Sequence, residues 1–430
     1  MDSTVIEDRS RPQSAKPLRR LIVATSIGNA LEWFDFAAYG FFAVTLSKLF
    51  FPAHDENVSL LMTFGTFGLS YVFRPLGALV LGRYGDRRGR KAALLVSLAL
   101  TTVGTLICAL IPTYASIGLA APLGLMAARI LISFSTGGEF GSGTALMIEQ
   151  KSKRKAFLAS WQFSSQGMST VLASCAGLAL STMLSPDQIE SWGWRAPFVF
   201  GLLVAPVGLY IRKHIDDTLP ASSQHTHNAA PVRDLLAHHK GRIFLAAGIM
   251  AVSTAASYLM ILYMPTYAVK QLHLPASTGF AATVVTGTIL MLFTPLMGHL
   301  ADRYGRSRMM VLSAIVTFAT IYPCFAWLLS SPSFAVLMAI MVLAGALKAI
   351  YFGPLAAVLS SLFPTSVRST GLGFSYNIGV MAFGGFTPWL VTAMIGATHN
   401  PLSPAFYLMA CAVLSLSCIA VYHFKLVKHI

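Results

Sequence analysis

Six charged side chains interrupt long apolar stretches of this sequence, and they are the residues best suited to chemistry: Glu32, Asp35, Arg74, Arg129, Glu139 and Lys348. If these stretches cross a membrane, each charge costs about 3 kcal/mol or more at the bilayer centre. Such residues are expected to face an internal cavity, to have a partner of opposite charge and to take part in function. A carboxylate can bind a proton, and a guanidinium or ammonium group can bind an anion. The set predicts a site that handles protons and anions together.

The first apolar stretch carries an acidic cluster. Glu32, Asp35 and Tyr39 follow one another at spacings of three and four residues, and Asn29 stands one helical turn before Glu32. Because residues three and four apart lie on the same side of a helix, these four side chains share one face. Arg129 stands in the fourth stretch, followed at helical spacing by hydroxyl side chains. These residues are the first candidates for a proton-binding and anion-binding site.

The other two cations differ in their surroundings. Arg74 precedes Pro75 and is interpreted as a structural residue. Lys348 lies in the middle of the tenth stretch, and the last acidic residue of the chain is Asp302. Because no acidic residue occurs within the spans of its half, this intramembrane ammonium group predicts an anionic ligand, with Tyr351 one turn away as a second contact. The alternative is that the long Lys348 side chain extends to an interface.

Polar groups in the fifth and eleventh stretches complete the candidate cavity. Gln162 and Gln166 lie one helical turn apart. In the second half Asn377 and Tyr376 are the repeat equivalents of Gln162 and Trp161. Amides and phenols can share a carboxylate ligand between two halves of a protein. Each of these groups could equally form a hydrogen bond to a neighbouring helix.

The composition indicates what positions these residues. The chain has 430 residues, of which 55% are hydrophobic and 11% are charged, with a net charge of +15. An ordinary soluble domain carries about 25% charged residues. Residues 92–128 contain no charge, which is long enough to cross a hydrocarbon core of about 30 Å. The composition excludes a soluble enzyme and a secreted disulfide scaffold. The five cysteines lie in apolar segments and are interpreted as packing residues without a metal or redox role.

The apolar pattern predicts an all-α membrane protein with twelve transmembrane helices in two pseudo-symmetric six-helix bundles. The twelve predicted spans are 20–47, 58–82, 91–111, 115–140, 156–184, 193–212, 242–269, 277–300, 308–329, 333–362, 369–395 and 404–425. The predicted organisation is a tail at 1–19, a first bundle at 20–213, a linker at 214–240 and a second bundle at 241–430. The linker is rich in histidine, which could suggest a metal site. No carboxylate or cysteine shares the histidine spacing, so a solvated linker is predicted.

The basic residues predict the orientation. With both termini in the cytoplasm, cytoplasmic segments hold 25 of the 31 basic residues and external segments hold three. Lys and Arg concentrate in the cytoplasmic loops of membrane proteins, so both termini are expected there. The basic residues are spread over alternate loops and form no single stripe, which argues against nucleic-acid binding.

The two predicted bundles contain related motifs. GRYGDRRGR at 82–90 corresponds to GHLADRYGR at 298–306, and Arg154 corresponds to Arg368 at nearly the same offset. A duplication with one topology in both halves is typical of transporters that rock two bundles about a midplane site.

The motif at 82–90 resembles the signature of the major facilitator superfamily, and this resemblance implies that fold. A small Gly82 would let helix ends approach closely, and Asp86 could meet the N-terminus of a neighbouring helix. The residues expected to gate the cytoplasmic side are Gly82, Asp86, Arg87, Arg90, Asp302, Arg303, Arg306 and Arg368. The alternative is a basic loop that only fixes topology.

A narrower resemblance rests on GNALEWFDFAAYGFF at 28–42, RPLGALVLGRYGDRRGRK at 74–91, WGWRAPF at 192–198 and LFPTSVRSTGLGFSYNIG at 362–379. Together these motifs are similar to the metabolite:proton symporter family, whose members carry citrate and other di- or tricarboxylates, 2-oxoglutarate, shikimate, or proline and betaine. FGGFTPWLVTAMI at 383–395 favours the citrate and tricarballylate branch, although Lys348 departs from the citrate pattern.

The resemblance also implies roles for single residues. In related proton-coupled sugar porters an aspartate of the first helix pairs with an arginine of the fourth, and Asp35 and Arg129 occupy comparable positions. Protonation of Asp35 would release Arg129 and allow substrate binding. The alternative is a static ion pair that fixes helix packing. Glu139 resembles a family-type acidic residue that could bind a proton or act in the cytoplasmic gate, and Glu32 is a further proton-coupling candidate.

The expected function is proton-coupled symport of a small organic acid across the bacterial inner membrane by a lipid-embedded monomer that needs no cofactor. The alternatives are symport of a zwitterionic osmolyte or a shikimate-like acid, and export by proton antiport. Osmolyte carriers of this family often extend into a C-terminal coiled coil, for which the sequence leaves no room after the last span. An enzyme or sensor is disfavoured because no HExxH motif, nucleophile elbow or phosphate loop is present.

Overall fold

The computed structural model describes residues 26–424, except 28, 31–32, 89, 139–143, 145–146, 149–153, 204, 207–234, 236 and 365–366, and it leaves the side chains of 85–87, 90, 91 and 94 undescribed. Within these ranges every regular element is a helix. Glu32 and Glu139 lie outside the described residues, as does most of the predicted linker.

The first half begins with a helical stretch at 33–41. It continues with α2 (Ala43–Phe50), α3 (Glu56–Tyr71), α4 (Phe73–Arg88), α5 (Arg90–Leu110), α6 (Tyr114–Ile117), α7 (Ala120–Thr136), α9 (Lys155–Met183), α10 (Pro186–Ser191), η1 (Gly193–Arg195) and α11 (Ala196–Gly201). The second half contains α14 (Lys240–Ser257), η4 (Tyr258–Tyr263), α15 (Met264–Lys270), α16 (Ala276–Tyr304), α17 (Arg306–Ser330), α18 (Phe334–Ser361), α19 (Arg368–Val380), η6 (Met381–Gly385), α20 (Thr387–Thr398) and α21 (Ser403–Tyr422).

Local sequence signals set several helix ends. The Asp55 side chain accepts a hydrogen bond from the Asn57 backbone at 2.8 Å and caps α3. Ser185 and Gln188 form a reciprocal capping box at α10. These contacts satisfy backbone N–H groups that the first turn of a helix cannot bond internally.

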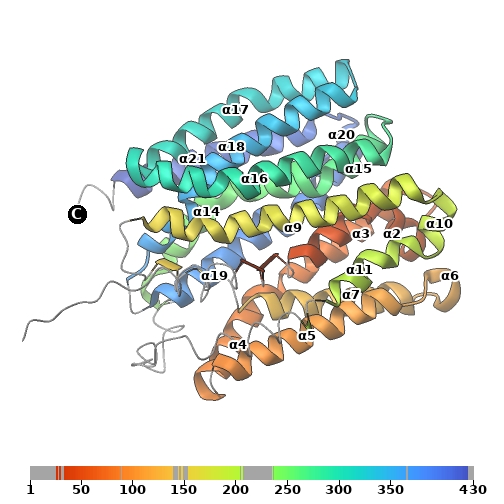
Figure 1. Ribbon diagram of the computed structural model, residues 1–430, viewed down its shortest axis with the longest axis horizontal. Coiled ribbons are helices and arrows are strands. Elements are labelled where there is room, and N and C mark those ends of the chain that lie inside the picture. Colours follow the sequence, from red (N-terminus) through yellow and green to blue (C-terminus); the bar gives the residue numbers. More distant parts are fainter. Residues whose placement is uncertain are drawn as a thin grey trace, which may run out of the picture.

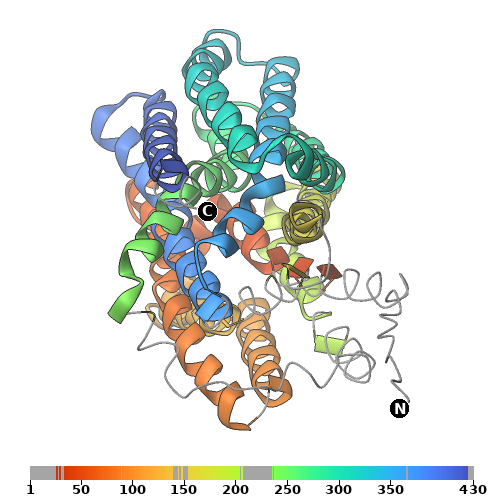
Figure 2. The same cartoon turned by 90° about the vertical axis from the view of Figure 1, so that its left-hand side faces the viewer.

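The helices form two groups (Figures 1 and 2). Helices α16, α17, α18 and α21 lie together, and α4, α5, α7 and α11 lie on the other side. The first-half helix α9 runs beside α16 along nearly its whole length. A second seam joins α3 and α4 to α20, η6 and α19. Two seams therefore hold the two halves together.

Glycines allow close helix contacts within each half. A β-carbon at Gly77 of α4 would overlap the carbonyl oxygen of Phe134 in α7, and one at Gly137 would overlap the carbonyl of Arg74. Gly353 of α18 packs in the same way against the backbone of Gly298 in α16. Only a residue without a side chain permits such approaches.

Gly82 does not have the role that its motif suggested. A β-carbon added there would meet nothing within 4 Å in the described structure, because the end of α4 extends away from its neighbours. The expectation that Gly82 brings helix ends together is wrong for this conformation. In α4 the close approach occurs at Gly77.

The helix lengths agree with a membrane protein. Seven helical segments of the described chain are long and apolar enough to span a bilayer, for example Glu56–Tyr84 and Ala276–Tyr304. The helices of the second half lie within a few residues of the predicted spans: 242–269 corresponds to Lys240–Lys270, and 333–362 to Phe334–Ser361. The all-α, two-bundle prediction is confirmed.

Two helices contain a π-helical segment at matching depth. Segment η4 interrupts the seventh span and η6 interrupts the eleventh. A β-carbon at Gly384 of η6 would press on the Tyr258 ring, so the two segments are in contact. Insertions of this kind often mark functional positions in helices.

Candidate functional site

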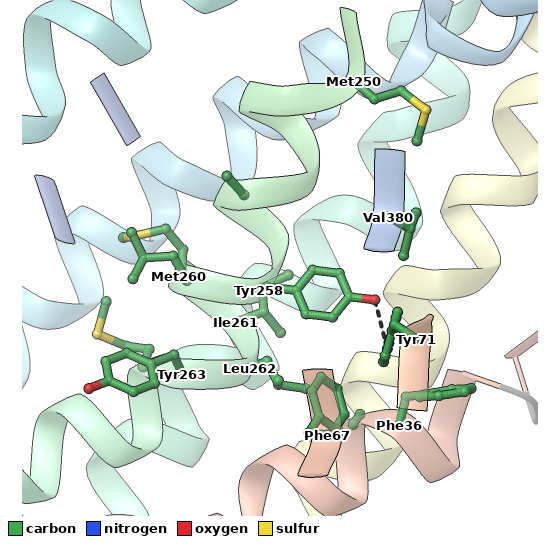
Figure 3. Packing of buried hydrophobic residues seen from close by; sticks show 14 of the residues in the cluster. Phe36, Phe67, Tyr71, Met250, Tyr258, Met260, Ile261, Leu262, Tyr263 and Val380 are labelled. Atoms are coloured by element: carbon green, nitrogen blue, oxygen red, sulfur yellow. Dashed lines mark hydrogen bonds between the residues drawn. The ribbon is translucent and has the colours of Figure 1, made fainter. Parts of the chain in front are cut away.

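An aromatic cluster fills the boundary between the halves (Figure 3). The Tyr258 hydroxyl of the second half donates to the Tyr71 hydroxyl at 2.9 Å. The Tyr71 ring also packs on Phe36, with the ring centres 5.4 Å apart, and on Phe67 at 5.0 Å. Nearer one end, Phe64 lies 5.5 Å from Tyr263. The cluster seals the middle of the molecule.

Asp35 lies beside this cluster and is fully buried. Thr105 of α5 donates a 2.6 Å hydrogen bond to its Oδ2 atom, while Oδ1 has no hydrogen-bond partner in the described chain. Thr105 lies in an apolar stretch whose pattern predicted no role for it. Asp35 therefore presents one oxygen that can take up a proton without breaking a hydrogen bond.

The expected ion pair of Asp35 is absent from the described structure. Arg129 Nη1 donates instead to the backbone carbonyl of Asp35 at 3.4 Å, and no carboxylate oxygen of Asp35 lies within 4.0 Å of its guanidinium nitrogens. The guanidinium lies over aromatic rings, and Thr105 holds the carboxylate toward α5. The two side chains are neighbours without direct charge contact in this conformation.

The two buried arginines share an aromatic surround. The guanidinium carbon of Arg129 lies 4.7 Å from the centre of the Phe36 ring and 4.6 Å from that of Tyr39. The guanidinium carbon of Arg74 lies 4.2 Å from Phe36 and 4.1 Å from Tyr71. Both arginine side chains are fully buried. Such cation–π contacts hold a guanidinium by its flat face.

Three predicted binding residues form their hydrogen bonds within the first half. Asn29 Nδ2 donates to the Ser165 hydroxyl at 2.7 Å and to the Gln162 carbonyl at 3.0 Å, and Gln162 Nε2 donates back to Asn29 Oδ1 at 3.0 Å. The Tyr39 hydroxyl donates to the Thr63 carbonyl at 3.0 Å. In this conformation these groups join helices.

Three others connect the halves. Gln166 Nε2 donates to the Tyr376 hydroxyl at 3.2 Å. Asn377 Nδ2 donates to the carbonyl of Gly137 at 2.8 Å. The polar groups of the fifth and eleventh spans therefore meet at the boundary, as their repeated position suggested.

Lys348 faces a different space. It lines a pocket whose lining residues all lie between Val252 and Leu408, in the second half. The polar part of the lining consists of hydroxyl groups and Lys348 itself: Ser253, Thr286, Ser313, Thr317 and Thr320. Lys348 Nζ lies 4.8 Å from the centre of the Phe352 ring, which stacks at 4.3 Å on Phe163 of α9. Phe352 thus lies between this pocket and the first half.

No acidic oxygen lies within 4.0 Å of Lys348 Nζ in the described ranges. The Tyr351 hydroxyl does not reach into the pocket as a free donor, because it donates to the Ile249 carbonyl at 2.5 Å. Among the described residues no group of three or more His, Cys, Asp or Glu side chains could hold a metal ion.

One end of the molecule, here called the basic end, carries Arg83, Arg154, Arg303 and Arg306. Asp302 of α16 accepts hydrogen bonds there from the backbone N–H groups of Ala156 and Phe157, at 3.1 and 3.0 Å, and so caps α9 across the two halves. Arg306 donates to the same carboxylate at 2.8 Å.

The other predicted gating residues form few contacts among the described residues. The Arg303 guanidinium lies 5.6 Å from the Tyr304 ring, and Arg368 Nε is buried without a partner in the described chain. The side chains of Asp86, Arg87 and Arg90 lie outside the described residues.

The opposite end, here called the acidic end, carries Asp55, Glu56, Asp187 and Glu190. Lys270 of α15 forms an ion pair with Glu56 of α3 and links the halves. Contacts between the halves thus exist at both ends of the described structure.

This arrangement has clear relatives. The family model described as Major Facilitator Superfamily matches residues 25–294, and a second model, described as Sugar (and other) transporter, matches residues 212–429. The chain belongs to the major facilitator superfamily. A citrate-proton symporter of Klebsiella pneumoniae is 36% identical over 400 residues, which cover 92% of this chain and 89% of the relative. A glycine betaine/proline/ectoine/pipecolic acid transporter, OusA of Dickeya dadantii, is 32% identical and covers 96% and 84%. The expected membership of the metabolite:proton symporter family is confirmed.

Solved structures agree on the fold. The partially occluded, inward-open xylose transporter XylE from E. coli superposes with a TM-score of 0.75 at 16% identity, covering 96% of this chain and 98% of that one. The human organic anion transporter MFSD10 gives a TM-score of 0.67 at 14% identity, covering 95% and 100%. At these identities the likeness concerns the fold alone.

Proposed function

We propose that this protein is a secondary transporter, not an enzyme, that carries a small organic acid together with protons by alternating access. The substrate class is a di- or tricarboxylate such as citrate. The proposal is supported by the citrate-proton symporters among its relatives and by the chemistry of its buried charges.

The balance of buried charges carries the proposal. In the described membrane interior Arg74, Arg129 and Lys348 face a single carboxylate, Asp35. Burying an ammonium or guanidinium group without a counter-charge is strongly unfavourable. An anionic substrate supplies negative charge, and a protonatable carboxylate lets the site change its own charge during the cycle.

Asp35 is the proposed proton-binding group, with Glu32 and Glu139 as further candidates. The Asp35 carboxylate lies close to Arg129, whose guanidinium donates a hydrogen bond to the backbone carbonyl of Asp35. Deprotonation would attract the Arg129 guanidinium away from the aromatic rings, and protonation would leave it free for the substrate. Proton and substrate would then occupy the site together.

The proposed substrate contacts lie in both halves. Arg129, Lys348 and Tyr351 would hold the anion, and the polar groups at the two helix seams would contribute as the halves separate: Asn29, Tyr39, Gln162, Gln166, Tyr376 and Asn377. Lys348 would reach the boundary by moving past Phe352. The gate at the basic end would consist of Asp302, Arg303, Arg306 and Arg368 with Asp86, Arg87 and Arg90 of the first half.

The protein is proposed to act as a monomer in the bacterial inner membrane, with both termini in the cytoplasm. The clustering of basic residues on alternate loops supports this orientation. Labelling of single cysteines introduced in the linker and at Asp55 tests it: a membrane-impermeant reagent should reach Asp55→Cys from outside and the linker only after permeabilisation.

Reconstituted uptake tests the transport proposal. Proteoliposomes with an imposed pH gradient are offered citrate, tricarballylate, 2-oxoglutarate, succinate, shikimate and betaine separately. Uptake of at least one acid, abolished by a protonophore, is expected. Uptake of betaine with none of the acids would replace the acid proposal by its alternative, which the proline/betaine transporters among the relatives favour. Acid efflux driven by inward proton flow would instead indicate antiport.

A further inference from the structure

Arg74 remains unexplained by helix packing. Its guanidinium is fully buried in the membrane-spanning segment Glu56–Tyr84, and all three of its nitrogens, Nε, Nη1 and Nη2, lack a hydrogen-bond partner among the described residues. An arginine that only joined helices would donate to backbone carbonyls or side chains of its neighbours. We infer that Arg74 binds a carboxylate group of the transported anion. This inference rests on the proposed function and adds the residue that recognises the substrate charge.

The surroundings of Arg74 are aromatic and offer its N–H groups no acceptor among the described residues. Trp33, Phe36 and Tyr71 have their ring centres 5.2, 4.2 and 4.1 Å from its guanidinium carbon. The N–H groups of a guanidinium point outward in its plane, and contact with aromatic rings leaves them without hydrogen bonds. A carboxylate approaching in that plane can accept two parallel hydrogen bonds. The aromatic rings therefore fix the orientation of a fork that fits a carboxylate.

A second guanidinium lies close by. Phe36 contacts both Arg74 and Arg129, and the two guanidinium carbons lie 4.2 and 4.7 Å from the centre of its ring. Arg129 also has two buried nitrogens without a hydrogen-bond partner in the described chain, Nε and Nη2. Two cations on one aromatic ring match an anion with more than one carboxylate.

The position is suitable for transport. Tyr71, which covers Arg74, bonds to Tyr258 of the second half, and Gly385 of η6 packs directly on the Tyr71 ring. The carbonyl of Gly137, which lies against the Arg74 backbone, accepts from Asn377. The arginine is thus one side chain away from the boundary that opens in alternating access. Separation of Tyr71 from Tyr258 would expose it.

A ligand-and-protein double-mutant cycle tests this inference. Purified full-length wild type, Arg74→Gln and Arg74→Lys are compared for binding of the diacid succinate and of its monoamide, succinamate, in which one carboxylate is a neutral carboxamide. The wild type should prefer the diacid by roughly 100-fold, the effect typical of a buried charged hydrogen bond. Arg74→Gln should bind both ligands equally weakly. Arg74→Lys, which keeps the charge but loses the fork, should fall between them.

Arg83→Gln is the matched control, because it removes an exposed arginine from the same helix. It should bind like the wild type. If Arg74→Gln still preferred the diacid by the wild-type factor, Arg74 would not contact a substrate carboxylate. Restoration of diacid binding by adding Glu32→Gln to Arg74→Gln would also overturn the inference, because it would identify Glu32 as the partner of Arg74. If Arg74→Gln does not fold, the ratio of the affinities for the diacid and its monoamide is measured in Arg74→Lys. A ratio equal to that of the wild type would then overturn the inference.

Failure of the inference and failure of the proposed function are distinguishable. An unchanged diacid preference in Arg74→Gln, with proton-driven uptake by the wild type, refutes only the role of Arg74. Loss of that preference, with no pH-driven uptake by the wild type, refutes only the proton coupling.

Discussion

The two halves keep their buried cations in opposite surroundings. In the first half Arg74 and Arg129 are wedged between aromatic rings, in contact with helices that approach to backbone distance at Gly77 and Gly137. In the second half Lys348 lines a pocket with hydroxyl groups. We call the rings of Phe36, Tyr39 and Tyr71 around these two arginines the aromatic cage. A rigid cage preserves the geometry of the two guanidinium groups. The flexible Lys348 side chain, in contrast, can change its position within the pocket. The difference suggests that the first half recognises the anion and the second half adjusts to it.

The largest expected effect concerns Asp35, the buried carboxylate of the first half. Asp35→Asn cannot release a proton but keeps an oxygen for the Thr105 hydrogen bond. With one proton per substrate and a gradient of one pH unit, the wild type should accumulate substrate about tenfold, and the variant should not accumulate it. Uphill uptake and substrate exchange are measured in proteoliposomes. Exchange should continue in the variant.

Asp187→Asn is the control, because it neutralises an exposed carboxylate at the acidic end and should leave accumulation unchanged. Accumulation by Asp35→Asn against a gradient would remove Asp35 from proton coupling. Loss of both exchange and accumulation, in a folded variant, would point to a static role in helix packing.

The next effect tests the rigidity of the cage. Gly77→Ala places a β-carbon onto the Phe134 carbonyl, which belongs to the backbone and cannot move alone. We expect a loss of about 3 kcal/mol in the free energy of unfolding, measured with denaturant in detergent. Gly345→Ala is the counterpart in the second half: its β-carbon would meet the Ile289 side chain at 3.3 Å. A side chain can yield, so this change should stay within about 1 kcal/mol. Gly353 of the same helix also packs on backbone, so the comparison concerns the neighbourhood of Lys348 and not the whole second half. Equal losses would contradict the contrast between the surroundings of the two arginines and those of Lys348.

The sequence predicted the helices of the second half to within a few residues, because uninterrupted apolar runs determine helix length in a membrane. The rotation of a helix about its own axis was harder to predict. Helix α18 is apolar on nearly all sides, so nothing in its pattern shows that Lys348 faces a pocket within its own half. Arg74 was interpreted as structural because Pro75 follows it, and its unbonded nitrogens become evident only when the neighbouring helices are in place.

Some contacts between helices could be predicted from the sequence and others could not. The repeat paired Asp302 with Asp86, for which a contact with a helix N-terminus was predicted, and Asp302 itself caps α9. Helical spacing grouped Asn29 with Asp35, yet Asn29 bonds to Gln162, because a buried amide forms hydrogen bonds with whichever helix lies closest. Whether Gly82 or Gly77 makes the close approach depends on the angle between helices, which spacing alone does not give.

A smaller effect is expected from replacing Lys348, the cation that lines the pocket of the second half. Lys348→Met removes an ammonium group that has no acidic partner among the described residues and fills the space with an apolar chain. Thermal unfolding should show a gain of about 1–2 kcal/mol, while affinity for the acid falls about tenfold. Val342→Met, at an exposed position of the same helix outside the pocket lining, should change neither. Higher stability with unchanged affinity would exclude Lys348 from the binding site and leave anion recognition to the cage alone.

The smallest expected effect is the loss of the exposed ion pair at the acidic end, measured against a change at the basic end. Asp302 is mostly buried, with 8% of its side chain exposed, and accepts hydrogen bonds from two backbone groups and Arg306, so Asp302→Asn should weaken the basic end by about 2 kcal/mol. The Glu56 side chain is 71% exposed, and an exposed ion pair contributes about 0.5 kcal/mol, which salt screens. Glu56→Gln should therefore alter thermal unfolding only slightly, and not at all at high salt. A loss from Glu56→Gln as large as that from Asp302→Asn would mean that the acidic end, and not the capped basic end, holds the halves together.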